Sequence, residues 1–183
     1  MLNKWDQRFI DLAMHIADWS KDPSTKVGAV VVDPSTRRVV STGFNGFPVG
    51  VEDTADRLEN REIKYEMVVH AEQNALVFAG PQAAGCTLYV TPLPPCARCA
   101  VVIIQARIAR VVCPRPDLTR EPWATQSRIA ESMFNEARRF ITLIDIMYEK
   151  KNRLVIRAEQ KIEKIFLLEK NKELPFLRTA SRI

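Results

Sequence analysis

The sequence predicts an α/β protein: a three-layer α/β/α sandwich around a five-stranded mixed sheet, with a helical extension at the C-terminus. Two observations lead to this fold class. Short apolar segments of strand composition alternate along the chain with longer segments whose apolar residues recur at helical spacing. The 183 residues, 46% hydrophobic and 27% charged, also have the size and composition of one globular domain with a substantial core.

The first third of the chain is predicted to form one helix and two paired strands. Apolar residues from Trp5 to Trp19 recur at helical spacing, which predicts an amphipathic helix that ends at Asp22-Pro23-Ser24. Strands are predicted at 27–32 and 38–42, joined by a turn. A long polar loop follows from 43 to about 64, and loops of this length in compact domains are usually functional.

Helices and strands alternate through the middle of the chain. Helices are predicted at 71–79, at 96–106 and at 124–137, and strands at 87–91 and 108–112. Alternation of this kind places helices on both faces of a sheet. We therefore expect the first two of these helices to lie together on one face.

The C-terminal part is predicted to add a fifth strand at 141–146 and a long amphipathic helix at 148–171. We therefore place a catalytic domain at 1–146 and a helical extension at 147–183. The net charge of +5 lies in the extension, which carries 10 basic and 5 acidic residues, whereas the catalytic domain carries 17 of each. A global basic field for nucleic acid is not indicated, and packing of the extension on its own domain or on a second subunit is favoured.

Four residues carry the chemistry: His70 and Glu72 in an H-x-E pattern, then Cys96 and Cys99 in P-C-x-x-C. Imidazole nitrogen and thiolate sulfur are donors that zinc prefers, and the helix start predicted at the two cysteines favours the thiolate form. Three ligands leave the fourth tetrahedral position open, which is the pattern of a catalytic zinc. We expect one zinc per chain, with Glu72 moving protons beside it, as in zinc-dependent nucleobase deaminases.

A structural zinc closed by Cys86 or Cys113 is the alternative, with Glu72 as a surface carboxylate. Structural sites have no need of the H-x-E spacing, so the catalytic interpretation is favoured. Both cysteines lie at the edges of apolar segments, where a free cysteine is usually a small core residue. No secretory signal or membrane-spanning stretch is recognised, and we expect a cytoplasmic protein without disulfides or membrane association.

Further stretches of the chain point to one family. They are Asp22-Pro23-Ser24-Thr25-Lys26-Val27-Gly28-Ala29, Thr42-Gly43-Phe44-Asn45-Gly46-Phe47-Pro48-Val49-Gly50-Val51-Glu52-Asp53, His70-Ala71-Glu72-Gln73-Asn74-Ala75, Leu88-Tyr89-Val90-Thr91 and Ile103-Ile104-Gln105-Ala106. Together they resemble the deoxycytidylate (dCMP) deaminases of the cytidine deaminase superfamily. The resemblance covers about 20–136, roughly two thirds of the chain.

The resemblance implies a role for five residues. His70, Cys96 and Cys99 would be the zinc ligands, Glu72 the proton shuttle, and Asn45 a contact to the nucleotide sugar or base. It also implies a five-stranded mixed sheet between helices, assembled into dimers or hexamers. From the residues alone, an Asn-Gly pair such as the one at Asn45 is equally a turn signal.

Two more residues are candidates for substrate binding. Lys26 lies in a small polar stretch between helix and strand, where its ammonium would suit a 5′-phosphate; an ordinary solvated lysine is the alternative. Ala71 stands between the predicted metal ligand and the predicted proton shuttle, and we expect it to contact the substrate.

The predicted function is zinc-dependent hydrolysis of dCMP to dUMP with release of ammonia. One alternative is a deaminase acting on a base within a polynucleotide, such as tRNA adenosine, flipped into the pocket. The neutral catalytic region argues against it, while the basic C-terminal extension keeps nucleic acid open as a partner. A second alternative is a non-catalytic, zinc-stabilised interaction module, and the H-x-E carboxylate argues against that one.

Overall fold

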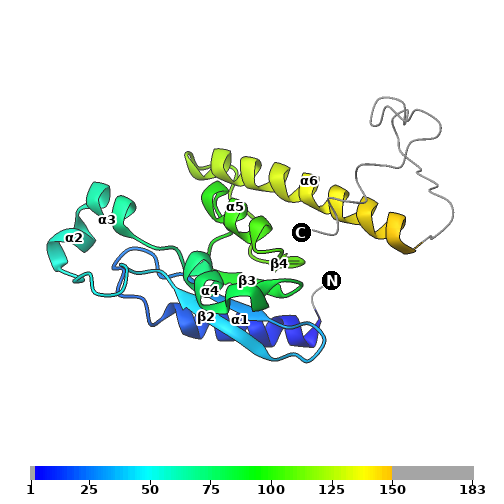
Figure 1. The fold of residues 1–183 in the computed structure, drawn as a ribbon. Helices are drawn as coiled ribbons and strands as arrows, with labels where there is room; N and C mark the ends of the chain where they lie inside the picture. The colour runs from blue at the N-terminus through cyan, green and yellow to red at the C-terminus, as the bar shows by residue number, and fades with distance from the viewer. Residues whose placement is uncertain (1–2, 150–183) are drawn as a thin grey trace. The chain divides into compact units, whose positions relative to one another are not determined.

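The computed structural model describes residues 3–149 of the chain, and its first compact unit ends at Phe140. The helices and strands are labelled in Figure 1. In chain order they are α1 (Lys4–Ala17), β1 (Gly28–Val32), β2 (Val39–Phe44), α2 (Ala55–Glu59), α3 (Arg61–Met67), α4 (Ala71–Ala79), the 3-10 helix η1 (Gly80–Ala83), β3 (Thr87–Thr91), α5 (Ala97–Gln105), β4 (Arg110–Val112) and α6 (Trp123–Glu149).

The four strands form one mixed sheet in the order β2-β1-β3-β4. β1 pairs antiparallel with both β2 and β3, whereas β3 and β4 run parallel. Gly28, the first residue of β1, is paired with Phe44 on one side and Thr91 on the other. The last residues of β2 and β3 therefore lie at the same end of the sheet.

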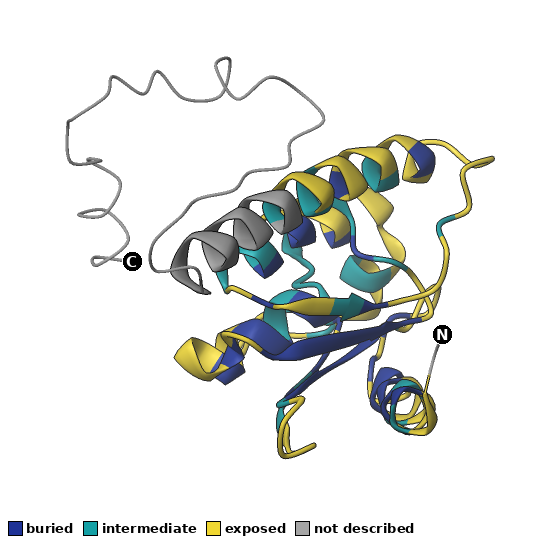
Figure 2. Ribbon diagram, turned by 90° about the vertical axis from the view of Figure 1, so that its right-hand side faces the viewer, coloured by how far each residue is buried: buried dark blue, intermediate teal, exposed yellow. Residues whose placement is uncertain are grey.

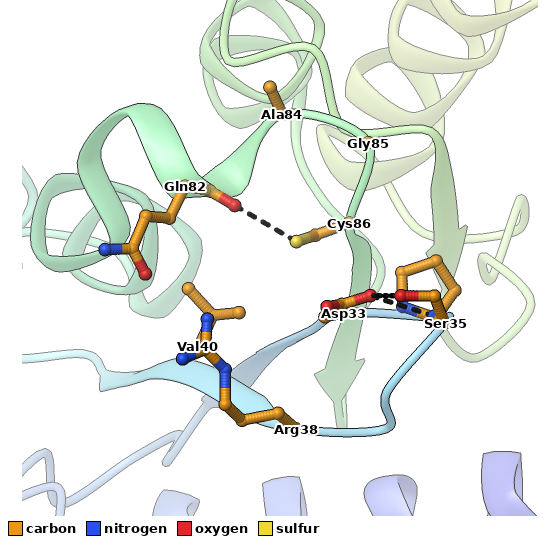
Figure 3. Close-up of a pocket in the computed structure, with 9 residues that line it drawn as sticks. Asp33, Ser35, Arg38, Val40, Gln82, Ala84, Gly85 and Cys86 are labelled. Carbon is orange, nitrogen blue, oxygen red and sulfur yellow. Dashed lines mark hydrogen bonds between the residues drawn. The ribbon is translucent and has the colours of Figure 1, made fainter.

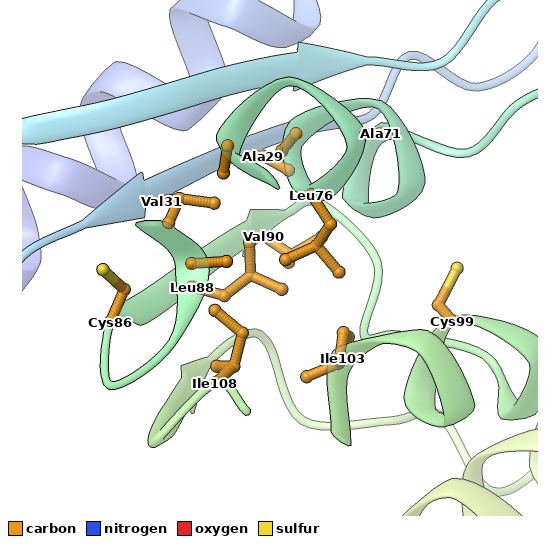
Figure 4. Close-up of a cluster of buried hydrophobic side chains, with 13 residues drawn as sticks. Ala29, Val31, Ala71, Leu76, Cys86, Leu88, Val90, Cys99, Ile103 and Ile108 are labelled. Atoms are coloured by element: carbon orange, nitrogen blue, oxygen red, sulfur yellow. The ribbon is translucent and has the colours of Figure 1, made fainter. Parts of the chain in front are cut away.

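Helices cover both faces of this sheet, and each face has its own core (Figure 2). Phe9, Ala13 and Ile16 of α1 pack on one face. Leu76 of α4 and Ile103 of α5 pack on the other, against alternate residues of β1 and β3 (Figure 4). An α/β fold with a mixed sheet is therefore confirmed, and α4 and α5 share one face as expected.

The predicted fifth strand at 141–146 is wrong. The described part of the chain has four strands, and 141–146 belong to α6. No glycine or proline stands between Trp123 and Glu149 to end the helix, which therefore runs on from the predicted 124–137 segment. A short β-branched apolar run cannot be distinguished from a helical segment by periodicity alone.

The predicted loop at 43–64 is partly helical. β2 extends to Phe44, and two short helices, α2 and α3, follow. Asn60 caps α3, since its side-chain oxygen accepts the Glu62 and Ile63 amides at 3.1 and 3.2 Å. Helices this short carry no apolar period, so the sequence pattern missed them.

Predictions for the C-terminal part reach beyond the described residues. Residues 150–171 of the helix expected at 148–171 lie outside the described residues. Its first two residues, 148 and 149, are the last two of α6. The domain boundary at 146 stays a prediction. Within residues 3–149, every helix is too short or too polar to cross a lipid bilayer.

A buried carboxylate anchors α1 to the sheet. Asp6, 1% exposed, accepts two hydrogen bonds from Arg110, at 2.7 and 3.1 Å, and one from the Tyr89 hydroxyl at 2.9 Å. The Asp6 carboxylate also accepts a hydrogen bond from the backbone amide of Asn3, the N-cap residue of α1. The first turn of α1 is thereby tied to β3 and β4.

Candidate metal centre and active site

The predicted metal ligands stand at the starts of two helices on the same face of the sheet. His70 is the N-cap residue of α4, and Cys96 is the N-cap residue of α5, with Cys99 in its first turn. The His70 amide donates to the Gln73 side chain at 3.1 Å, which holds the entry to α4. Because α4 and α5 pack side by side on one core, their first turns bring these residues together.

The three donor atoms form a compact cluster. His70 Nδ1 lies 3.2 Å from Cys99 Sγ and 3.6 Å from Cys96 Sγ, and all three atoms lie within 4.8 Å of one another. One imidazole and two thiols are the soft donors that suit zinc. Among the residues that the structure describes, neither Cys86 nor Cys113 joins this cluster. The donor set therefore fits a zinc ion with one open position rather than a closed structural site.

Charges within the cluster favour metal binding. The neighbouring Cys99 thiol and His70 lower the pKa of Cys96 to about 4, whereas the hydrogen bond to Cys96 and burial raise the pKa of Cys99. The pair thus holds a thiolate at Cys96 already at neutral pH. A divalent cation would draw the proton from Cys99 as well, since zinc binds the thiolate form.

Glu72 lies beside this cluster inside the protein. The residue is 4% exposed, and the charges of His70 and Cys96 act on its carboxyl. Burial raises the pKa of this carboxyl, the largest of several influences. A carboxyl whose proton affinity is raised by burial is better suited to accept a proton than one in solvent.

A glycine lets α4 approach the sheet closely. A Cβ atom at Gly43 of β2 would overlap the Ala71 carbonyl oxygen and the Ala75 amide nitrogen in the first turns of α4. The absence of a side chain there lets the backbone of β2 lie directly against the helix that follows His70. Ala71 itself is fully buried at this contact.

Asn45 is buried, and its side-chain amide is committed to the protein. The Oδ1 atom accepts the Val27 amide at 2.8 Å, while Nδ2 donates to the Thr25 carbonyl at 3.0 Å and to Asp22 Oδ2 at 3.4 Å. The next residue, Gly46, bridges to Val69 beside His70. Asn45 therefore lies on the loop next to the metal cluster, and its side chain fastens that loop.

Lys26 lies on the surface, apart from the donor cluster. Its ammonium donates to the Asp18 carbonyl at 3.2 Å, at the end of α1. Two arginines of the predicted 43–64 loop also bond within the protein: Arg57 donates to the Glu52 carbonyl and Arg61 to the Tyr65 hydroxyl. None of these three side chains is buried in an ion pair.

Sequence reasoning missed one functional candidate, Lys64. This lysine was placed at the end of a polar loop, but it is only 6% exposed and pairs with Asp22. The sequence pattern indicates a helix end and a family resemblance around Asp22, but no partner for its carboxylate. Nothing in local composition indicates such a pairing, because its partners lie about forty residues apart in the chain.

A separate pocket lies at the other end of β1 and β3. It measures about 340 Å³ and is lined by Asp33, Arg38, Gln82 and Cys86, among others (Figure 3). The Cys86 thiol donates to the Gln82 carbonyl at 3.1 Å. No predicted site residue lines this pocket, which is therefore distinct from the metal cluster.

The family model for the cytidine and deoxycytidylate deaminase zinc-binding region matches residues 3–114. The chain belongs to this family. The match spans α1 to β4 and includes all three donors of the cluster. Zinc is the cofactor of this deaminase fold, and the donor set of the cluster agrees with it.

Several relatives are similar over most of their length. An uncharacterised deaminase of Aliivibrio fischeri is 45% identical over 140 residues, covering 75% of this chain and 91% of the relative. The human deoxycytidylate deaminase is 36% identical over 136 residues, covering 71% and 75%. A dCMP deaminase of the cyanophage S-TIM5, in complex with dCMP and dUMP, superposes with a TM-score of 0.55 at 25% identity, covering 73% and 94%.

A second family model, for AFG1-like ATPases, matches residues 125–183. This match begins inside α6 and continues past the described residues. All six glycines of the chain lie before residue 86, so the matched segment holds no glycine-rich phosphate-binding loop. We propose no ATP hydrolysis for it.

Proposed function

We propose that this deaminase acts on deoxycytidylate, converting dCMP and water to dUMP and ammonia. The observation that carries the proposal is a buried carboxyl, Glu72, beside a cluster of three zinc donors. The names of the human relative and of the cyanophage enzyme, which was crystallised with dCMP and dUMP, support the choice of substrate.

His70, Cys96 and Cys99 are the proposed metal ligands. Bound there, zinc would supply a Lewis acid that makes water a nucleophile at neutral pH. The protein would hold the ion on three sides, through one imidazole and two thiolates. The start of α5 would stabilise the two thiolates, because Cys96 and Cys99 stand in its first turn, near backbone N–H groups and the positive end of the helix dipole.

Glu72 is the proposed proton carrier. Its carboxylate would accept a proton from the attacking water and deliver it to N3 of the cytosine ring. After water has added to C4, the same carboxylate would take the proton of the C4 hydroxyl and pass it to the exocyclic amine, which leaves as ammonia as the C4 carbonyl forms. Burial supports this role, since a carboxyl out of solvent exchanges its proton with the substrate rather than with bulk water.

The loop that carries Asn45 is proposed to form the substrate side of the pocket, together with Ala71. Gly46 exchanges two backbone hydrogen bonds with Val69, at 3.2 and 2.9 Å, next to His70. Lys26 is the proposed cation for the 5′-phosphate, because its exposed ammonium has a single carbonyl partner and can turn to an anion.

Ammonia release from three substrates tests the proposal: dCMP, deoxycytidine and a single-stranded oligonucleotide, each incubated with zinc-loaded protein. We expect dCMP to be the preferred substrate. A preference for the oligonucleotide would favour deamination within a polynucleotide, and the basic residues of 147–183 would then gain a role. Inactivity on all three, in zinc-loaded folded protein, would favour the interaction module.

Two further proposals concern the assembly state and the cellular location of the enzyme. A dimer or hexamer is proposed from the family resemblance, and a cytoplasmic location from the sequence. Light scattering of the purified chain measures the first, since each assembly state has its own mass.

A further inference from the structure

Lys64 places a positive charge inside the protein, a short distance along the chain from the metal cluster. It lies in α3, six residues before His70, and is 6% exposed. Its ammonium donates to Asp22 Oδ1 at 3.1 Å and to the Ser24 hydroxyl at 2.7 Å. Lysine is almost never buried unless it is paired, so the ion pair with Asp22 accounts for the burial of Lys64.

Asp22 is the centre of the polar cluster that receives this charge. Its Oδ1 atom also accepts the backbone amides of Ser24 and Thr25, at 2.8 and 3.1 Å. Burial opposes the charged form, but these amides and Lys64 prevail and lower the pKa of the carboxyl. Asp22 and Lys64 therefore form a pair of one carboxylate and one ammonium, whose charges cancel.

The same carboxylate reaches the loop proposed to face the substrate. Asp22 Oδ2 lies 3.4 Å from Asn45 Nδ2, and the Ser20 hydroxyl donates to the Asn45 carbonyl at 2.8 Å. Asn45 in turn holds the Val27 amide. The segment from Ser20 to Val27 and the Asn45 loop thus form one hydrogen-bonded body.

A second link runs from this body to the metal ligand. The chain leaves α3 at Val68 and meets Gly46 through the Val69 bridge, one residue before His70. Lys64 fixes the start of this stretch, and the bridge fixes its end. A displacement of α3 would therefore shift the Asn45 loop relative to His70.

We propose that Lys64 is a positioning residue, whose buried ammonium holds α3 and the Asn45 loop in the geometry that binds the nucleotide. The proposal rests on the function proposed above. Because its charge is already neutralised by Asp22, Lys64 has none left for a phosphate, and it acts on the substrate only through the loop. An ion pair that merely stabilises the fold would affect binding only as far as it affects folding.

The chain provides a matched control. Lys21 and Asp53 form a second ion pair, at 2.8 Å, between the same segment and the region that follows Asn45. The Lys21 side chain is 72% exposed, whereas that of Lys64 is 8% exposed. Exposed pairs contribute little to stability, so Lys21→Met is expected to leave both folding and kinetics unchanged.

Three variants separate positioning from stability: Lys64→Met, Asp22→Asn and the double variant. For each, zinc content, the midpoint of thermal unfolding, and kcat and KM for dCMP are measured. Either single change leaves a buried group without its charge partner and lowers the midpoint. The double variant has no unpaired charge and regains the midpoint, but it still lacks the ammonium that links α3 to Ser24.

Positioning predicts that KM for dCMP rises about tenfold or more in Lys64→Met and stays raised in the double variant, with zinc retained and kcat little changed. A KM that returns to the wild-type value together with the midpoint would overturn the proposal. If Lys64→Met does not fold, the double variant and Lys21→Met carry the same comparison. Wild-type protein inactive on dCMP would instead overturn the proposed function, and this inference with it.

Discussion

At the scale of single residues, the charged groups that matter are the buried ones. Asp6, Asp22, Lys64 and Glu72 are all less than 9% exposed, although each belongs to a residue type that normally stays in solvent. Asp6 and Asp22 have cationic partners and several hydrogen bonds. Glu72 is in no ion pair with a lysine or arginine among the described residues, which agrees with the proton-carrying role proposed for it.

Asp6→Asn tests the anchor between α1 and the sheet. Arg110 and the Asn3 amide hold the pKa of the Asp6 carboxyl well below its usual range, against the opposing effect of burial. A lowered pKa stabilises the fold above the unfolded value of about 3.9, and that contribution is lost as the pH falls below it. We expect Asn to lower the free energy of unfolding by about 1–3 kcal/mol at pH 7.

Urea unfolding with a chelator present measures this effect without a contribution from zinc. The difference between wild type and Asp6→Asn should be full at pH 7 and should shrink towards pH 3. A difference that stays constant over this range would show that the charge of Asp6 does not stabilise α1.

The same residues show which contacts can be predicted from the sequence and which cannot. His70 and Cys96 stand at the starts of two helices expected on one face of the sheet, so the sequence predicts that these ligands and Cys99 meet. Lys64 and Asp22, or Asp6 and Arg110, are joined only by the fold. No local pattern distinguishes such residues from solvated ones, because their burial depends on which elements pack together.

At the scale of helices and strands, close backbone approach places α4. Gly43→Ala would put a methyl group against the Ala71 carbonyl and the Ala75 amide, which are backbone atoms and cannot turn aside. We expect a loss of about 1–3 kcal/mol in the free energy of unfolding, together with weaker zinc binding as His70 moves. Chemical unfolding and a zinc-chelator competition measure the two effects.

Gly46→Ala is the control for that variant. A Cβ atom at Gly46 would meet only the Phe44 ring, at 3.9 Å, in ordinary van der Waals contact. Equal losses from the two alanine variants would contradict the role assigned to close packing at Gly43.

Element prediction succeeded where the apolar period was long or the strand was buried. The helices at α1, α4 and α5 and the strands β1 and β3 were predicted near their observed bounds, because packing and pattern agree there. It failed at 141–146, where β-branched residues outweighed the absence of a helix end. It also failed at α2 and α3, which are too short to show an apolar period; α3 is held by its Asn60 cap and by Lys64.

At the scale of the whole molecule, α6 belongs partly to the deaminase. Ala124 and Ala130 are buried, and Phe134 packs against the core that also contains Cys99. The deaminase family match ends at residue 114, before this helix. The first turns of α6 therefore complete a core that the family motif alone does not cover.

Two truncations test the proposed domain boundary. A chain ending at residue 146 should keep its zinc and its activity within about twofold, because the site and its core lie before that point. A chain ending at residue 121 loses Ala124, Ala130 and Phe134 and should unfold at a lower temperature. A loss of activity in the first truncation, with zinc retained, would assign residues 147–183 a part in catalysis.

In the proposed mechanism, Glu72 moves protons beside a three-ligand zinc. The most direct test is the rate of dUMP and ammonia formation from dCMP by Glu72→Gln, measured with its zinc content and compared with Glu59→Gln, a change at an exposed carboxylate. We expect Glu72→Gln to hold one zinc per chain and to turn over about 10²–10⁴-fold more slowly, with Glu59→Gln unchanged. Full zinc occupancy with wild-type turnover in Glu72→Gln would contradict the account.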